Sequence, residues 1–134
     1  MLDADKATLE HVMSRKDGSA PTVVSVAPAA SVRQALRLMT LHDVSQLPVM
    51  ERDACVGSVT EYALTTRSLE STRILDATVG EVMDEPFPLV DARQPVESVT
   101  KLLSKASPAV LIRRDGRVAG IVTRSDVLQF LMAR

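Results

Sequence analysis

The sequence predicts an α+β fold built from two copies of one β-α-β-β-α unit. Residues 57–60 (Gly-Ser-Val-Thr) recur as residues 120–123 (Gly-Ile-Val-Thr), and residues 11–14 (His-Val-Met-Ser) recur as residues 81–84 (Glu-Val-Met-Asp). Between these motifs, the same order of strand-like and helix-like apolar patterns appears twice. Such duplication is typical of a module assembled from two similar supersecondary units.

Each copy begins with a short helical turn that ends in Val-Met, followed by a strand and an amphipathic helix. We place the two strands at 23–26 and 87–90. In copy one, Ser31 is the predicted N-cap of a helix whose apolar residues recur three and four positions apart: Val32, Ala35, Leu36 and Met39. In copy two, Pro95 opens the equivalent helix, whose apolar positions are Val96, Val99, Leu103 and Ala106.

A two-stranded hairpin and a final helix complete each copy. The predicted hairpin strands are 47–50, 55–59, 109–112 and 118–122, and the predicted final helices are 61–69 and 124–132. The second hairpin turns at Asp115-Gly116, which is a strong two-residue turn signal.

We divide the chain into a first motif at 1–70 and a second at 71–134, joined near residues 70–78. A unit of roughly 60 residues buries too little apolar surface to be comfortably stable alone. The two copies are therefore expected to pack sheet to sheet with pseudo-two-fold symmetry around a shared core. That packing would leave clefts between the copies, where small ligands are expected to bind.

Composition narrows the functional classes. The 134 residues carry 16 basic and 17 acidic side chains, with no basic stripe for nucleic acid, and only three aromatic residues. We find no apolar run long enough for a membrane helix, no secretory signal, and one cysteine, so we expect a cytoplasmic protein. No metal-ligand spacing, nucleophile motif or phosphate loop is present, so we expect neither an enzyme nor a metal or cofactor.

The duplicated Gly-x-Val-Thr motif carries a family resemblance. In copy two it extends to Gly-Ile-Val-Thr-Arg-Ser-Asp at 120–126, and the whole chain resembles a CBS-domain pair, or Bateman module. Residues 44–49 (Val-Ser-Gln-Leu-Pro-Val) and 79–83 (Val-Gly-Glu-Val-Met) strengthen a likeness to the C-terminal regulatory region of cystathionine β-synthases. Some members of that group bind S-adenosylmethionine, and the resemblance also implies a homodimer. The pyridoxal-phosphate domain has no counterpart here, so the chain is either a stand-alone relative or a regulatory fragment.

Thr123 and Asp126 are the strongest candidate site residues. Thr-x-x-Asp is close to the capping-box pattern of an ordinary helix start. The same two side chains also suit a ligand, because a helix N-terminus attracts anions and an ionised carboxylate accepts hydrogen bonds from ribose hydroxyls. Copy one has Ala63 where copy two has Asp126, so we expect one competent site rather than two.

The family resemblance implies further contacts around the same ligand. Carried over by position, these are Val44, Gln46, Thr22, Val23, Val24 and Val122. Val44 would cover the adenine or sulfonium region, and Gln46 would bond the amino-acid end of the ligand. For the valines, plain core packing is the alternative interpretation.

Three functions follow, in order of preference. The first is a regulatory module that senses S-adenosylmethionine in the cleft between the motifs. The second is a sensor of AMP, ADP or ATP, for which no clear trio of cationic side chains is evident. The third is a ligand-free dimerisation module, favoured by the missing carboxylate at position 63. The sequence does not identify the regulated partner or a tethered enzyme.

Overall fold

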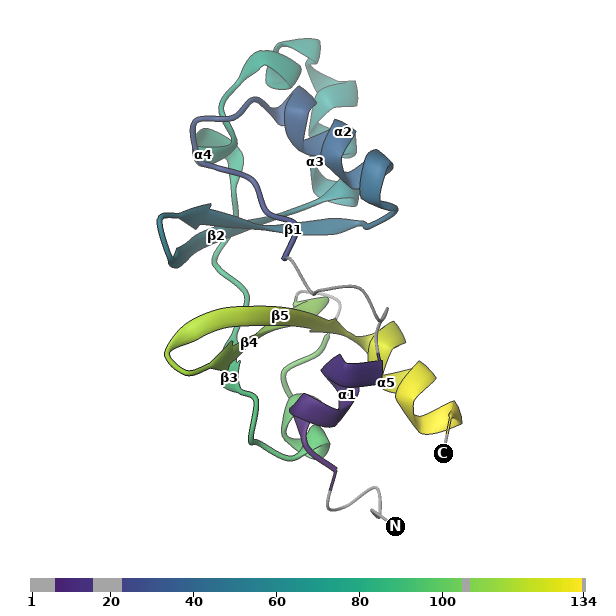
Figure 1. Ribbon diagram of the computed structural model, residues 1–134. Coiled ribbons are helices and arrows are strands. Elements are labelled where there is room, and N and C mark those ends of the chain that lie inside the picture. The colour runs from purple at the N-terminus through teal and green to yellow at the C-terminus, as the bar shows by residue number, and fades with distance from the viewer. Residues whose placement is uncertain (1–6, 16–22, 105–106, 134) are drawn as a thin grey trace. The chain divides into compact units, whose positions relative to one another are not determined.

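Among the residues that the structure describes, the β-strands form one hairpin and one three-stranded sheet (Figure 1). In the hairpin, β1 (Gln46–Glu51) pairs antiparallel with β2 (Ala54–Thr60). In the sheet, β4 (Ala109–Arg114) lies between β5 (Arg117–Thr123), its antiparallel partner, and β3 (Leu89–Asp91), its parallel partner. Both hairpins change register at the same place in the repeat, which supports the predicted duplication.

The computed structural model describes residues 7–15, 23–104 and 107–133. It divides the chain into two units. We call Val24–Phe87 the central unit, and Met1–Val23 together with Pro88–Arg134 the terminal unit.

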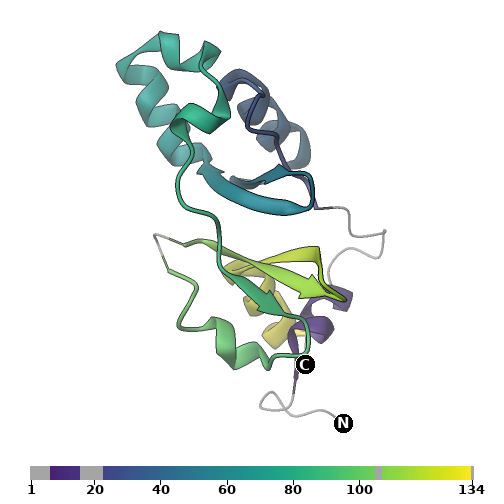
Figure 2. The same cartoon turned by 90° about the vertical axis from the view of Figure 1, so that its left-hand side faces the viewer.

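The central unit places its helices against one face of the β1–β2 hairpin (Figures 1 and 2). These helices are α2 (Val32–His42), α3 (Glu61–Glu70), α4 (Val79–Val82) and the 3₁₀ turn η2 (Thr72–Asp76). Ser31 caps α2 as predicted, because its Oγ accepts from the Gln34 backbone N–H at 3.0 Å and the Gln34 side chain returns a bond to the Ser31 N–H. The buried apolar residues are Val26, Val32, Ala35, Met39, Leu47, Val49, Val59, Leu64, Val79 and Val82.

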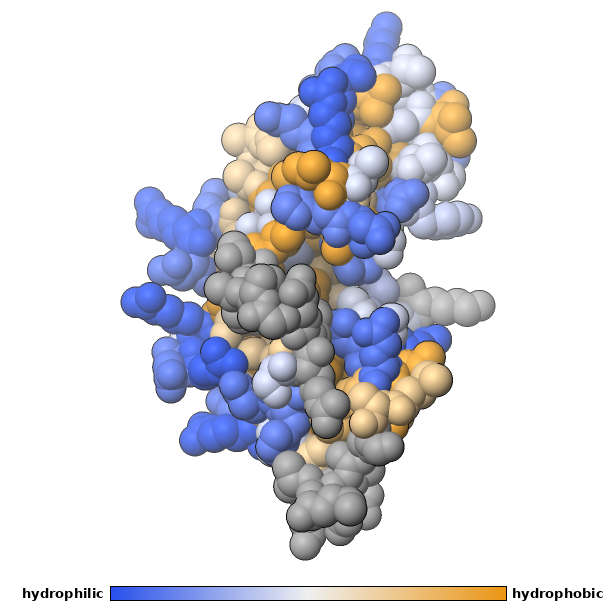
Figure 3. All heavy atoms as spheres, turned by 45° about the vertical axis from the view of Figure 1, so that its right-hand side comes forward, coloured by the Kyte–Doolittle hydropathy of each residue, from blue (hydrophilic) through white to orange (hydrophobic). Residues whose placement is uncertain are grey.

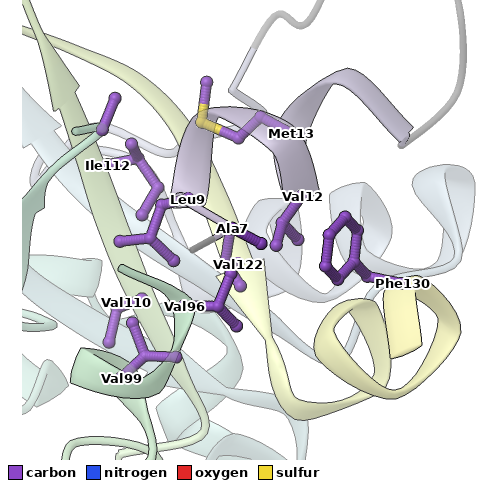
Figure 4. Packing of buried hydrophobic residues seen from close by; sticks show 11 residues of the cluster. Ala7, Leu9, Val12, Met13, Val96, Val99, Val110, Ile112, Val122 and Phe130 are labelled. Carbon is purple, nitrogen blue, oxygen red and sulfur yellow. The ribbon is translucent and has the colours of Figure 1, made fainter. Parts of the chain in front are cut away.

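The terminal unit packs two helices on its three-stranded sheet. They are α1 (Leu9–Arg15) and α5 (Arg124–Met132), and a 3₁₀ turn, η3 (Val96–Val99), closes the same core. Figure 4 shows the Phe130 ring of α5 beside Val12 of α1, with Val110, Ile112 and Val122 of the sheet in the same cluster. Among the described residues, no helix is long and apolar enough to cross a membrane.

The short Val-Met helices pack across the repeat boundary. Helix α1 opens copy one along the sequence, yet it packs on the second hairpin, where the Met13 side chain lies over Gly120. Helix α4 opens copy two, yet it packs on the first hairpin, where Met83 lies over Gly57. The spatial units therefore differ from the division at 1–70 and 71–134 that we expected from the repeats.

Adding a methyl group at Gly57 should destabilise the protein more than adding one at Gly120. A Cβ at Gly57 would overlap the Met83 sulfur and lie 3.0 Å from the backbone oxygen of Asp84, whereas at Gly120 its three nearest neighbours all belong to the flexible Met13 side chain, whose sulfur would lie 2.9 Å away. We expect Gly57→Ala to lower the free energy of unfolding by about 1–3 kcal/mol. Urea denaturation of both variants tests this, and an equal or larger loss for Gly120→Ala would contradict it.

Two predicted elements are shorter than expected. The predicted strand at 23–26 is reduced to a single parallel bridge between Val26 and Val49. The predicted helix after Pro95 is only the 3₁₀ turn η3. Here the hydroxyls of Ser98 and Thr100 donate to the carbonyls three residues back, at 2.7 and 2.8 Å, which favours a tight turn over a continuing α-helix. Ala106, placed in that helix, lies outside the described residues.

The other predicted elements are confirmed to within one or two residues at their ends. Helix α5 has the predicted bounds, and α3 extends one residue beyond its prediction. The Asp115-Gly116 turn is also confirmed, because both residues have positive φ (53° and 77°), as a two-residue hairpin turn of type I′ requires.

Candidate functional site

The N-terminus of α5 holds the two strongest candidates in contact with each other. Thr123 is the N-cap, and its Oγ1 accepts from the Asp126 backbone N–H at 3.2 Å. In return, the Oδ2 of Asp126 accepts from the Thr123 backbone N–H at 2.9 Å and from the Thr123 hydroxyl at 3.1 Å. Both side chains are half-buried. The capping-box interpretation of Thr-x-x-Asp is therefore confirmed.

The cap also fixes a carboxylate in the first turn of a helix. The positive end of the helix dipole stabilises an anion at this place, whether it belongs to Asp126 or to a ligand. Arg124 and Ser125 follow Thr123 and are exposed. A carboxylate accepts several hydrogen bonds through its two oxygens, so capping and contact with ligand hydroxyls are compatible roles for the same side chain.

The equivalent helix start in copy one lacks this carboxylate. Thr60 caps α3 by accepting from the Ala63 backbone N–H at 3.2 Å. The methyl side chain of Ala63 cannot accept a bond from the Thr60 N–H, so this cap is one-sided. The sequence predicts that the two copies differ at this position. In the structure, they differ in how the start of the helix is capped.

The candidates from copy one lie near this one-sided cap. Val44 follows the left-handed residue Asp43 that ends α2, and it packs half-buried against the central core. Gln46 begins β1 directly opposite Thr60, and its Oε1 accepts from the Ser45 hydroxyl at 3.0 Å. The Glu61 N–H donates to the Ser45 carbonyl at 2.9 Å and ties the start of α3 to β1.

The pairing of Gln46 with Thr60 was missed in the sequence analysis. Counting back from the two-residue turn Arg52-Asp53 would place Gln46 opposite Val59, because the register shifts by one residue between Val49 and Met50 and that shift has no signal in the sequence. Arg52 takes a positive φ of 59° at this turn although it is neither glycine nor asparagine, so the residues of the turn do not themselves indicate a hairpin turn.

The remaining candidates have different surroundings. Val122 is fully buried in the terminal core, so its side chain serves packing. Val24 is half-buried against the central core. Val23 is also half-buried, and it is the last residue of the N-terminal segment that belongs to the terminal unit. Thr22 lies outside the described residues. The structure thus brings Thr123, Asp126 and Val122 together in one unit, and Val24, Val44 and Gln46 together in the other.

Within residues 7–15, 23–104 and 107–133, no group of three or more His, Cys, Asp or Glu side chains is placed to hold a metal ion. The features that stand out are the two repeated helix N-termini, each capped by a threonine at the end of a hairpin.

The fold and these caps define a duplicated α+β module. The chain belongs to the CBS domain family, whose model matches it twice, at residues 9–70 and 79–133. It is therefore a CBS-domain pair, a class of module that is generally regulatory.

Several proteins are similar to this chain along most of their length. The CBS domain-containing protein YhcV of Bacillus subtilis is 26% identical over 115 residues, covering 85% of this chain and 82% of YhcV. The crystal structure of the CBS domain protein NE2398 superposes with a TM-score of 0.81 at 25% identity, covering 93% of this chain and 97% of that one. CBSX2 of Arabidopsis thaliana in complex with AMP gives a TM-score of 0.74 at 25% identity, covering 95% and 97%.

Proposed function

We propose that this CBS pair is a regulatory sensor that binds an adenosyl compound, with Thr123 and Asp126 at the start of α5 as its anchoring contacts. The observation that carries the proposal is the Asp126 carboxylate, which the cap with Thr123 holds in the first helical turn. Ribose offers two neighbouring hydroxyl donors, and a carboxylate is an acceptor well suited to both.

The difference between the copies supports one anchoring site. At the start of α3, Ala63 provides no acceptor, so the same ribose contact is not available there. The family resemblance also names Val44 and Gln46, which lie together in the central unit, and these two residues stay predictions from the sequence.

Two ligands fit the adenosyl class. S-adenosylmethionine is favoured by the resemblance to the regulatory region of cystathionine β-synthases that the sequence motifs predict. AMP gains support from CBSX2, which has been crystallised with it. Arg124, exposed beside Thr123, is a cation available to a phosphate.

A dimerisation module is the second candidate function. The described helices expose large apolar side chains, and Figure 3 shows apolar residues gathered over α5 in the lower part of the view. On α5 the exposed fractions are 55% for Leu128 and 77% for Met132, and on α3 they are 82% for Tyr62 and 83% for Leu69. Exposed apolar clusters of this kind favour association with another protein surface, here a second copy of the chain.

Isothermal titration of the intact chain with S-adenosylmethionine, AMP and ATP in parallel separates these functions. Our account predicts saturable binding of at least one of them with a stoichiometry of one. Preference for S-adenosylmethionine would support the cystathionine β-synthase likeness, and preference for AMP or ATP would support a nucleotide sensor. No heat from any of the three, in a folded sample, would contradict the sensor and leave dimerisation as the leading function.

A further inference from the structure

Helix α4 is too short to be stable by itself and depends on its contacts with the β1–β2 hairpin (Figure 1). It has four residues, of which Val79 and Val82 are buried. Met83 follows as the C-cap, and its backbone N–H donates to the Val79 carbonyl at 2.8 Å. The attachment of α4 therefore rests on these three apolar side chains and on the bridge between Asp84 and Ser58.

The thioether of Met83 fills the space directly over Gly57 in β2. A Cβ built on Gly57 would overlap the Met83 sulfur and would lie 2.8 Å from its Cγ. It would also lie 3.0 Å from the backbone oxygen of Asp84. The sulfur can lie this close to the strand only because glycine has no side chain. On the side that faces β2, the sulfur therefore has no room for an additional atom.

The described methionines differ in how far solvent reaches them. Met39 is 2% exposed and Met13, which lies over Gly120, is 7% exposed. Met83 is half-buried, as is Met50 in β1, and Met132 is largely exposed. Met83 thus combines contact with solvent and contact with the β2 backbone, whereas its counterpart Met13 is enclosed in the terminal core.

A thioether that solvent reaches is open to oxidation by peroxides. With hydrogen peroxide, the sulfur lone pair attacks one peroxide oxygen, the O–O bond breaks and an S–O bond forms. The proton of the transferred oxygen passes to the departing hydroxide, which leaves as water, so the sulfur is oxidised by two electrons and the peroxide is reduced. We propose that Met83 is an oxidation site of this kind, and that its sulfoxide loosens α4 from the β1–β2 hairpin.

The surroundings of Gly57 explain why the sulfoxide would not be accommodated. Oxidation turns an apolar thioether into a polar group with a strong acceptor oxygen, and such a group is costly to bury without a donor. The donors of the adjacent Ser58 are already engaged, because its backbone N–H donates to the Asp84 carbonyl at 3.0 Å and its hydroxyl to the Glu85 carbonyl at 2.6 Å. The oxidised side chain is therefore expected to leave its place over Gly57 and turn toward solvent.

Peroxide treatment of the intact folded chain, followed by peptide mapping with mass spectrometry, tests the site. All samples carry Cys55→Ser, because peroxide also oxidises thiols and a serine hydroxyl can keep the bond that the Cys55 thiol donates to the Gly57 carbonyl. We expect Met83 to form its sulfoxide about tenfold faster than Met13 and Met39 in the folded chain. In the urea-unfolded chain the three rates should become equal.

Thermal unfolding of the same samples tests the consequence. We expect oxidation to lower the melting temperature by about 4–8 °C, and methionine sulfoxide reductases with a thiol reductant to restore it. Met83→Leu keeps an apolar side chain of similar volume that cannot form a sulfoxide, so it should lose this response. Met50→Leu removes another half-buried methionine and is the matched control that should keep the response.

The time course of oxidation gives a readout that needs no variant at position 83. The fraction of chains with the lowered melting temperature should follow the sulfoxide fraction of Met83, and not that of Met50 or Met132. Oxidation of Met83 no faster than that of Met13, an equal loss of stability in Met83→Leu and its parent, or a loss that follows Met50 or Met132 would overturn the proposal.

Discussion

A fragment comprising residues 24–87 should fold on its own, with the marginal stability expected of so small a unit, whereas a fragment of nearly equal length, 9–70, should not. The first follows the central unit, and the second follows the first family match. Only the first contains α4, which buries Val79 and Val82 on the hairpin and places Met83 over Gly57. It also keeps the bridge between Ser58 and Asp84, and the bond from the Ser58 hydroxyl to the Glu85 carbonyl at 2.6 Å.

The expected difference is large for fragments of this size. Two buried valines and a methionine contribute on the order of 5 kcal/mol, which is about the whole stability of a small domain. Fragment 9–70 would also expose Leu9, Val12 and Met13, whose partners lie in the terminal unit. Circular dichroism with urea titration should show a cooperative transition for 24–87 and none for 9–70. Equally cooperative unfolding of both fragments would contradict this expectation. It would mean that the packing of α1 on the second hairpin and of α4 on the first contributes little stability.

Replacing Asp126 by alanine should abolish most of the adenosyl binding while leaving the fold intact. Hydrogen bonds to a charged group contribute about 1.5–3 kcal/mol each, so we expect a loss of affinity on the order of 10- to 100-fold. The fold should persist because α3 already forms with Thr60 as its cap and Ala63 in the equivalent position. The accompanying loss of one cap partner should cost about 1 kcal/mol in stability.

Two matched variants separate the loss of the cap from the loss of the ligand contact. Asp126→Asn keeps an oxygen that can accept from the Thr123 N–H but removes the charge, so it should retain stability and lose affinity. Ala63→Asp completes the capping box of α3 with Thr60, so it should raise stability slightly without affecting the site in copy two. Unchanged affinity of Asp126→Ala, measured by isothermal titration in a folded sample, would remove Asp126 from the site.

Much of the fold could be predicted because local signals and tertiary packing agree. The hairpins, α2, α3 and α5 each combine an apolar period with a cap or a turn residue, as with Ser31, Thr123 and Asp115-Gly116. The segment after Pro95 has an equally good apolar period, but its hydroxyl side chains bond back to the chain and shorten the helix. The spacing of the apolar residues does not reveal that these hydroxyl groups compete with the hydrogen bonds of a helix.

The packing of α1 and α4 could not be read from the sequence. The repeat shows that the two helices are equivalent but not which hairpin each one covers, because Gly57 and Gly120 hold equivalent positions in the repeat and each lies beneath a methionine. The candidate site was predicted in part. The Thr123–Asp126 contact is present, but the same pattern predicts a cap as well as a ligand contact, and capping geometry is compatible with both.

The central claim is that an adenosyl ligand binds at the start of α5, and amide NMR of the labelled intact chain during AMP and S-adenosylmethionine titrations tests it most directly. We predict saturable shifts of the amides of Thr123 to Asp126 with at least one of the two ligands, and weaker or absent shifts at the equivalent residues Thr60 to Ala63. Saturable shifts confined to other parts of the chain, or no shifts with either ligand, would contradict the claim.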